Sequence, residues 1–540
     1  MDFAELYKRS IVVQAVVSAV AILILGSVVI VIYSCWISPV LAHRKLKRNG
    51  FKGPPPCFPL GNISDMRKNV THKKSTVLSF DNHRQSFEIT HDIHPIVFPY
   101  FSRWSRLHGK VFIYWLGTEP FVYVSDPEFL KQMSSGVMGK SWGKPRVFKN
   151  DRKPMFGNHG LLMVEGQDWV HHRHIITPAF SPSNLKAMAH VMVDSATIML
   201  DQWSNILDSN NNKIEIDVEN DITKMTAEII ARTSFGSNIV SDDNGRKVFE
   251  KLRAMQLTLF KSTRLVGVPF SKFIYQKRTQ EAKKLGQEID EILVSIIQSR
   301  KDSIGNNNDR GKDFLGIMLQ DNSKNKKLSV EELVDECKTL FFSGHETTAL
   351  ALTWTLFLLA LHPEWQNHLR EEIKLVIGEG ELLLNDLTNI GKLKKMGWVM
   401  NEVLRLYSAA PNVQRQARED IQVGELIIPN GTNIWVDLVG MNHDSDLWGN
   451  DVNEFKPERF KEDTLHGGCK HKMGYLPFGF GGRMCIGRNF TIMEYKIVLI
   501  LLLTRFSFTL SPSYNHSPAI MLSLRPTNGL PLIVQSIAIG

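Results

Sequence analysis

The chain has 540 residues, of which 43% are hydrophobic, and it carries a formal net charge of +9. Its length allows a large core, and no interior linker is long enough to separate independent domains. The basic residues form no single stripe, which excludes nucleic acid as a partner and favours a surface facing anionic lipid or an acidic protein. The five cysteines are an odd, widely spaced set, which fits a reducing compartment better than a disulfide framework.

The N-terminal segment predicts a retained membrane anchor. Residues 11–37 carry no charge and no proline, which is long enough for a helix that spans a bilayer and too long for the apolar core of a cleaved signal peptide. The basic residues just after this segment predict that residues 1–10 are lumenal and that the rest of the chain faces the cytosol. Residues 38–60 read as a basic and proline-rich linker, stiffened by Gly53-Pro54-Pro55-Pro56, ahead of one domain over residues 61–540.

The remaining chain is mainly α with small β-sheets, because most apolar residues recur at intervals of three and four. The sequence predicts a few short strands: Val111–Trp115, Phe121–Val124, Ile421–Ile428, Ile520–Leu524 and Leu532–Val534. In Trp169-Val170-His171-His172-Arg173, the tryptophan and the arginine lie four residues apart and so share a helix face.

The clearest helix begins at Ser329. Ser329-Val330-Glu331-Glu332 is a capping box, and no proline follows until Pro363, so the helix runs for about 33 residues, roughly 50 Å. A helix this apolar must cross the interior. Its centre nevertheless holds Ser343-Gly344-His345-Glu346-Thr347-Thr348, and such a local break of the apolar pattern indicates a functional site.

Two later motifs follow. Glu402 and Arg405 lie three residues apart and can pair on one helix face, and Arg459 stands in Pro457-Glu458-Arg459-Phe460 about fifty residues on. The segment from Phe478 to Gly487, F-G-F-G-G-R-M-C-I-G, sets Cys485 in a glycine-rich loop two residues after Arg483 and just before a predicted helix over Arg488–Leu503. A thiolate that ligates haem iron needs this setting, because glycine amides and a helix start stabilise the sulfur charge.

This loop resembles the haem-loop signature of the cytochrome P-450 family, F-x-x-G-x-R-x-C-x-G, and the resemblance implies the fold of that family with an N-terminal transmembrane helix. It implies haem b as cofactor, with Cys485 as the metal ligand and with Phe478 and Gly487 beside the haem. It implies propionate contacts for Trp169, Arg173, Arg415 and Arg483. The catalytic pair it implies is Thr347, which hydrogen-bonds to dioxygen, and Glu346, which relays protons; it also implies a structural network of Glu402, Arg405 and Arg459.

The resemblance also implies partners and a location. No G-x-G-x-x-G follows a strand, so no flavin or nicotinamide site is visible, and electrons are expected from a membrane-bound NADPH-cytochrome reductase, a flavoprotein. The expected site of action is the endoplasmic reticulum membrane, as a single-pass protein with its catalytic domain in the cytosol, acting with O2 on an apolar substrate.

The soluble chain further resembles the clan-72 plant branch, especially its gibberellin-oxidising subfamily. The segments that carry this are Lys52–Pro56, Asp92–Phe101, Gly344–Leu350, Pro411–Asp420 and Tyr475–Phe490. The resemblance implies a monooxygenase acting on a terpenoid, most simply a gibberellin or related diterpenoid acid. A pentacyclic triterpenoid is the alternative substrate, and a haem sensor or electron carrier is the non-enzyme alternative. The segments expected to line the pocket are Pro154–Leu162, Leu257–Val268, Ala409–Val413 and Pro518–Leu522.

Overall fold

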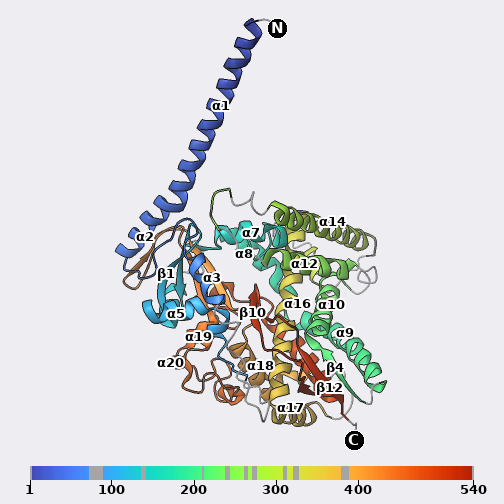
Figure 1. Ribbon diagram of the computed structural model, residues 1–540. Helices are drawn as coiled ribbons and strands as arrows, with labels where there is room; N and C mark the ends of the chain where they lie inside the picture. Colours follow the sequence, from blue (N-terminus) through green and yellow to red (C-terminus); the bar gives the residue numbers. More distant parts are fainter. Residues whose placement is uncertain are drawn as a thin grey trace.

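The structure is a computed structural model that describes residues 3–71, 89–134, 141–209, 212–236, 244–260, 266–270, 276–307, 313–319, 327–378 and 388–537. One long helical rod leaves a globular body built mainly of helices, with small sheets at its edges (Figure 1). The expectation of a mainly α fold with small sheets is confirmed.

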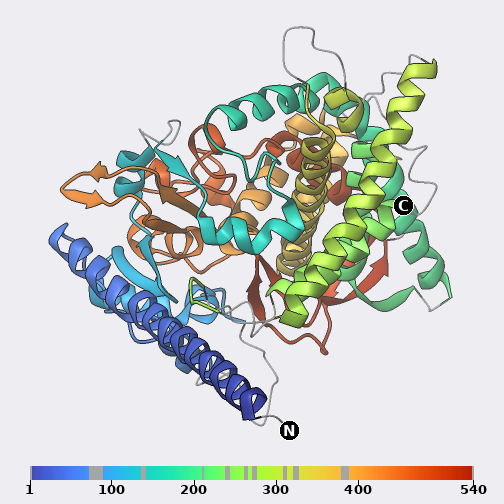
Figure 2. The same ribbon diagram turned by 90° about the horizontal axis from the view of Figure 1, so that it is seen from above.

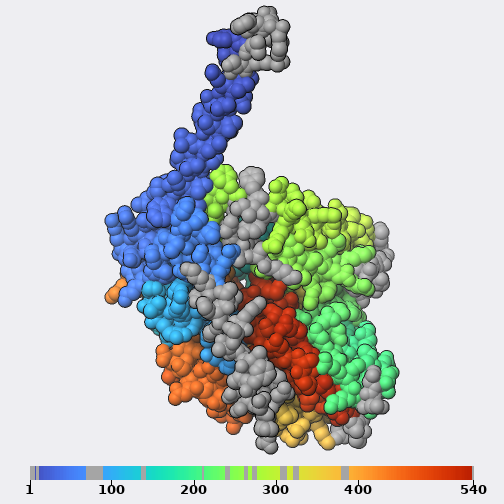
Figure 3. All heavy atoms as spheres, in the orientation of Figure 1, coloured from blue at the N-terminus to red at the C-terminus, as the bar shows by residue number. Residues whose placement is uncertain are grey.

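The rod consists of α1 (Phe3–Ile32), a π-helical stretch (Tyr33–Ile37) and α2 (Ser38–Arg48). Its mean hydropathy reaches 3.0, and the apolar window is 0% buried within the protein. The space-filling view shows the outer part of the rod standing clear of the globular body (Figure 3). The helix therefore continues past the apolar stretch into the basic residues, and the first part of the expected linker is helical.

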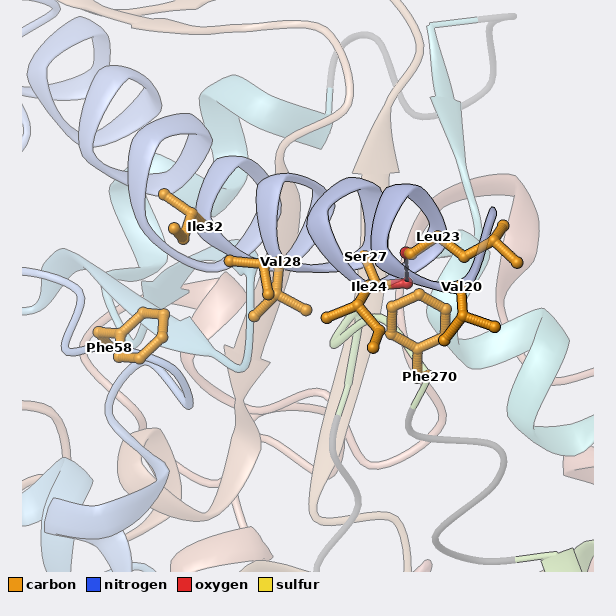
Figure 4. A pocket seen from close by; sticks show the side chains of 9 residues that line it. Val20, Leu23, Ile24, Ser27, Val28, Ile32, Phe58 and Phe270 are labelled. Atoms are coloured by element: carbon orange, nitrogen blue, oxygen red, sulfur yellow. Dashed lines mark hydrogen bonds between the residues drawn. The ribbon is translucent and has the colours of Figure 1, made fainter. Parts of the chain in front are cut away.

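An apolar groove runs between α1 and the segment of residues 266–270 (Figure 4). Phe58 and Phe270 form one side of this groove, and both rings are about half exposed. The other side consists of α1 residues, namely Val20, Leu23, Ile24, Ser27, Val28, Val31 and Ile32. The base of the segment is fixed to the body because the amide of Thr118 donates to the carbonyl of Val266 at 3.2 Å.

Helix α16 (Val330–Leu361) crosses the centre of the body, as the capping box predicts. The Ser329 side chain accepts from the Glu332 amide, and the Glu332 side chain accepts from the Ser329 amide. Helix α10 (Val218–Phe235) packs along it. Helix α21 (Arg488–Arg505), expected after the cysteine loop, packs against both α16 and α9 (Pro182–Asp208). Figure 2 shows α16 running obliquely among the surrounding helices when the body is seen from above.

The other helices cover these central ones. On the N-terminal side they are α3 (Ile63–Thr71), α4 (His94–Val97), α5 (Pro99–His108), α6 (Pro127–Ser134), α7 (Arg146–Phe156) and α8 (Gly166–Ile176). The middle of the chain adds α12 (Asn244–Phe260), α14 (Gln276–Asn307), α15 (Phe314–Leu319), α17 (Pro363–Val376) and α18 (Lys394–Leu406). Short α19 (Leu438–Asn442) and α20 (Ser445–Trp448) precede the 3-10 turns η5 (Pro457–Phe460) and η7 (Gly481–Arg483).

A five-stranded sheet has the order β1-β2-β8-β5-β3, in which only β2 and β8 are parallel. Its strands are β1 (Val111–Leu116), β2 (Glu119–Val124), β3 (Trp142–Gly143), β5 (Asn412–Ala417) and β8 (Asn433–Asp437). A three-stranded sheet has the order β4-β12-β9, from β4 (Lys213–Asp217), β9 (Phe506–Leu510) and β12 (Pro531–Ser536).

Two expected strands are instead hairpins. Residues 421–428 form β6 (Ile421–Val423) and β7 (Leu426–Ile428), because Gly424 turns the chain at φ +58°. Residues 520–524 fold back at Leu522, which separates β10 (Pro518–Met521) from β11 (Ser523–Pro526). Strands β3, β4, β5, β8 and β9 were not predicted, because they are short and take their pairing from distant segments.

Candidate active site

Cys485 lies in a tight loop between η7 and the start of α21. Its amide donates to the carbonyl of Phe478 at 2.9 Å, which closes the loop. The Cys485 side chain is exposed, although protein surrounds it closely enough that burial raises the pKa of the thiol. The amide of Gly487 and the guanidinium groups of Arg173 and Arg488 act in the opposite direction. The thiol therefore faces open space inside a cationic, amide-rich loop, which is a setting for a thiolate ligand.

Helix α8 meets this loop from the other side. The guanidinium of Arg173 donates to the carbonyl of Met484 at 3.1 Å. The guanidinium of Arg483 stacks over the ring of Trp169, with 4.7 Å between guanidinium carbon and ring centroid, and donates to the carbonyl of Val164 at 3.0 Å. The two residues of the W-x-x-x-R motif thus both contact the cysteine loop, Trp169 at Arg483 and Arg173 at Met484.

The same region concentrates positive charge. Arg415 and Arg483 are partly or wholly buried, and burial lowers the pKa of each to about 10. Lys144 joins them, because burial and the nearby Arg415 and Arg483 hold its pKa well below the ordinary range. The sequence reasoning missed Lys144, and no local pattern marks it.

The carboxylate of Glu165, which acts on Lys144 and Arg483, is already paired. Glu165 accepts from Arg418 at 2.7 Å and pairs with Lys149 at 2.7 Å. Burial would raise the pKa of Glu165, but these bonds lower it to about 2. Among the described residues, the Nε of Arg415 is buried with no acceptor. The cluster of Lys144, Arg415 and Arg483 therefore fits a dianionic group such as the two propionates of a haem.

The central motif of α16 opens the helix toward accessible space. The hydroxyl of Thr347 donates to the carbonyl of Ser343 at 2.8 Å. Ser343 is exposed and Thr347 is half-buried, while most of α16 is buried. Gly344 has a packing role, since a Cβ there would lie 2.5 Å from Cδ1 of Ile230 on α10. The glycine thus lets two helices approach closely.

Glu346 turns away from solvent and is only 2% exposed. Its Oε1 accepts from Nε2 of Gln256 at 2.9 Å and from Oγ of Ser523 at 2.5 Å. Arg525 donates to Oε2 at 3.4 Å. The expected proton relay is therefore a carboxylate held inside a polar cluster, and its partners lie far away in the sequence.

The expected charged network lies beneath this region. Glu402 and Arg405 are fully buried and joined by two contacts of 2.7 and 2.8 Å. The third member, Arg459, places its Nε 3.4 Å from Glu402 and its Nη1 2.8 Å from Asp451. Arg405 also donates to the carbonyls of Asn442, Val452 and Glu454.

Two further buried carboxyl groups escaped the sequence reasoning. His172 of α8 and Glu336 of α16 are 2.6 Å apart, which ties the helix of the W-x-x-x-R motif to the central helix. Glu494 of α21 is 1% exposed, and burial raises the pKa of its carboxyl group well above the ordinary value, while the hydroxyl of Thr348 acts in the opposite direction. Neither feature has a sequence signal, because both depend on helix packing.

Comparisons with known proteins agree with this geometry. The family model described as cytochrome P-450 matches residues 86–531. A cytokinin hydroxylase of Arabidopsis thaliana is 38% identical over 534 residues, covering 97% of this chain and 99% of that protein. Cytochrome P-450 709B1 of the same plant is 36% identical, covering 92% and 93%. Cytochrome P-450 714C2 of Oryza sativa subsp. japonica is 34% identical, covering 93% and 94%.

The open cysteine loop and its cationic surroundings define a haem-thiolate protein. The chain belongs to the cytochrome P-450 family. As in the family, its cofactor is haem b bound through a cysteine thiolate, and its activity is that of a haem-thiolate monooxygenase of plant metabolism. This activity uses O2, an apolar substrate and electrons from a redox partner.

Proposed function

We propose that this chain is a membrane-anchored monooxygenase that hydroxylates or epoxidises a terpenoid, with a gibberellin or a related diterpenoid acid as the first candidate. The observation that carries the proposal is the exposed Cys485 thiol in its cationic loop, followed by α21, which meets α16 where the hydroxyl of Thr348 lies 3.5 Å from that of Thr491. Bound haem supplies the activation of dioxygen, from which one oxygen atom enters the substrate. The protein supplies the ligand, the charge and the pocket.

The residues have the following roles in this proposal. Cys485 ligates the iron, and Phe478 and Gly487 shape the loop around it. The propionates are held by four cations and one ring, namely Arg173, Arg415, Arg483, Lys144 and Trp169. The negative charge of the propionates balances the positive charge of this cluster. Thr347 presents its hydroxyl to dioxygen, and Glu346 contributes to proton delivery. Glu402, Arg405 and Arg459 fix the chain beneath the haem.

Apolar segments support a terpenoid substrate. Ala409–Val413 and the hairpin tip of Pro518–Leu522 are mostly buried or half-buried. Pro154–Leu162 is described throughout, whereas residues 261–265 of the Leu257–Val268 segment lie outside the described residues. Side chains of this kind exclude water around a hydrocarbon skeleton.

Two other substrate classes are alternatives to a gibberellin. A pentacyclic triterpenoid fits the same apolar walls. Cytokinins enter because two cytokinin hydroxylases of Arabidopsis thaliana are 38% and 37% identical to this chain. A haem sensor or electron carrier is the non-enzyme alternative, and it would show no substrate-dependent product.

The first experiment compares the wild type with Cys485→Ser in membranes, using the reduced, carbon monoxide-bound difference spectrum. A Soret band near roughly 450 nm in the wild type alone is the expected result for a thiolate ligand. A wild-type band near roughly 420 nm in folded protein would overturn the assignment. Titration with a gibberellin, a triterpenoid and a cytokinin then identifies the substrate class by the shift of the iron from low to high spin.

The anchor supports a location at the endoplasmic reticulum. Residues 11–37 would span the bilayer, with residues 1–10 in the lumen, residues 38–60 as the connection, and residues 61–540 facing the cytosol and an NADPH-cytochrome reductase. The groove of Phe58 and Phe270 against α1 supports a body seated on the membrane, because lipid chains would cover its apolar walls. Protease digestion of intact microsomes tests the orientation: the body should be digested without detergent.

A further inference from the structure

The carboxylate of Glu346 joins segments of the chain that lie far apart in the sequence. Gln256 reaches it from the last turns of α12, and Ser523 and Arg525 reach it from β11. The three donors are 2–5% exposed. Glu346 and these three donors are called the Glu346 cluster below.

Gln256 makes the most specific contact in this cluster. Its single Nε2 atom donates to Oε1 of Glu346 at 2.9 Å and to the carbonyl of Met521 at 3.1 Å. One amide therefore connects α12, the central helix α16 and the last residue of β10. Helix α12 packs against β10, and α16 packs against β11.

The hairpin β10–β11 presents one face to Glu346. Ser523 and Arg525 are two residues apart on β11, so their side chains point to the same side. Because the side-chain period of a strand is two residues, a slip of one residue would move both donors to the opposite face. The pairing of Met521 with Ser523 leaves Leu522 alone at the tip.

The tip itself is held in an unfavourable conformation. Leu522 has φ +78°, a left-handed value that a branched side chain seldom adopts. Such a conformation persists where surrounding contacts over-determine it. The contacts on either side of Leu522 are the Gln256 bond to Met521 and the Ser523 bond to Glu346.

A second carboxylate and a second arginine extend the charges of the cluster. Arg525 lies between Glu346 and Glu219 of α10, and donates to Glu219 at 3.1 Å. Arg253, which is partly exposed, lies 3.8 Å from Glu219 on its outer side. Burial favours the neutral form of Glu346, but Arg525 and the other donors hold its pKa below the ordinary value. An ionised, buried carboxylate with directed donors is costly to displace, so it fixes whatever is bonded to it.

We propose that the Glu346 cluster sets the position of the β10–β11 hairpin against α16, so that Gln256, Ser523 and Arg525 are positioning residues that determine how a substrate lies in the pocket. The inference rests on the proposed function, in which the hairpin tip lines the pocket. Glu346 immediately precedes Thr347. The carboxylate that holds the hairpin is therefore on the same turn of α16 as the residue proposed to face dioxygen.

The test replaces Gln256 by Leu, which removes both donations at similar side-chain size. The control is Gln298→Leu, because Gln298 is an exposed amide on α14 that bonds to Asp302. Hydrogen–deuterium exchange of residues 518–526 is measured in the haem-loaded full chain. We expect exchange to accelerate about tenfold or more in Gln256→Leu and to stay unchanged in Gln298→Leu.

A second readout is the ratio of products formed from one accepted substrate. We expect Gln256→Leu to change this ratio while the carbon monoxide band keeps its wild-type position. If Gln256→Leu does not fold, Ser523→Ala removes one donor with little change in volume, and a smaller acceleration of exchange is expected.

Unchanged exchange of the hairpin in both Gln256→Leu and Ser523→Ala would overturn the proposal. Faster exchange with an unchanged product ratio would also overturn it, since the hairpin would then move without affecting the substrate. A wild-type band away from roughly 450 nm would instead count against the haem-thiolate assignment, and it would leave the exchange result readable on its own.

Discussion

Arg405 holds Glu402 through two nitrogen–oxygen contacts of 2.7 and 2.8 Å, and both side chains are completely buried. They are three residues apart on α18, so one helix face carries both. The remaining donors of Arg405 reach backbone carbonyls of Asn442, Val452 and Glu454. The pair therefore connects α18 to the irregular chain that leads to the cysteine loop.

Replacing Arg405 by Leu should destabilise the protein strongly. The substitution leaves the Glu402 charge buried and three carbonyls unpaired, and the expected loss is about 3–5 kcal/mol in the free energy of unfolding. Urea unfolding measures it. Arg106→Leu is the control, since Arg106 is exposed and bonds to Ser102 within its own turn. A loss below about 1 kcal/mol for Arg405→Leu would show that the pair does not hold this region.

Gly344→Ala should cost stability through a steric clash. The new methyl group would lie 2.5 Å from Cδ1 of Ile230, so either the Ile230 side chain must shift or α10 and α16 must separate, at about 1–3 kcal/mol. In a chain that already carries Ile230→Ala, the change Gly344→Ala should cost less, because the clashing side chain is gone. Gly397→Ala is the matched helical control: nothing lies within 4 Å of its added Cβ, so it should be neutral or stabilising. Thermal unfolding of all variants decides the matter, and equal melting temperatures for the two alanine variants would contradict the packing role.

Arg415→Leu should affect the haem-free and haem-loaded proteins differently. Burial and Arg483 lower the pKa of Arg415, so its charge is unfavourable in the protein alone, and the variant without haem should be at least as stable as the wild type. Haem should dissociate about tenfold faster, a change of about 1.4 kcal/mol, because one propionate contact is lost.

Arg418→Leu provides the contrast to this variant. It leaves Glu165 without its arginine and should destabilise both forms. Haem transfer to an acceptor protein and thermal unfolding supply the measurements. A slower unfolding of haem-loaded Arg415→Leu with unchanged haem dissociation would show that Arg415 does not face a propionate.

The partly buried position of His443 leads us to expect that the protein loses stability in mild acid. Burial, with a contribution from Arg405, lowers the pKa of this histidine to about 4, while Nε2 contacts the carbonyl of Leu406 at 3.0 Å. Folding therefore favours the neutral ring. This contribution is complete above the ordinary pKa of about 6.5 and is lost as the pH falls toward 4, at most about 3 kcal/mol.

Measuring the free energy of unfolding from about pH 7.5 to about pH 4.5 tests this prediction. This interval starts above the usual histidine pKa of about 6.5 and ends below it. His443→Gln should flatten the curve, because the glutamine amide keeps a donor for Leu406 and does not titrate. An equally steep curve in the variant would assign the acid sensitivity to other groups.

Local patterns in the sequence were sufficient for several features. The Ser329 capping box and the absence of proline up to Pro363 predict α16, because helix starts and stops depend on neighbouring residues. The uncharged segment of residues 11–37 predicts the long apolar helix. The spacing around Cys485 predicts a loop followed by a helix, because glycine and helix propensities act within a few residues.

Other features depend on the tertiary structure alone. Ser523 lies 177 positions from Glu346, and Lys144 lies far from Arg415, so no local pattern relates them. The packing role of Gly344 depends on Ile230, which lies on another helix. The turns at Gly424 and Leu522 divide two expected strands because backbone conformation and pairing override the run of apolar residues. Short-range propensities act between neighbours, whereas buried charges take partners from whichever segments packing brings within hydrogen-bond distance.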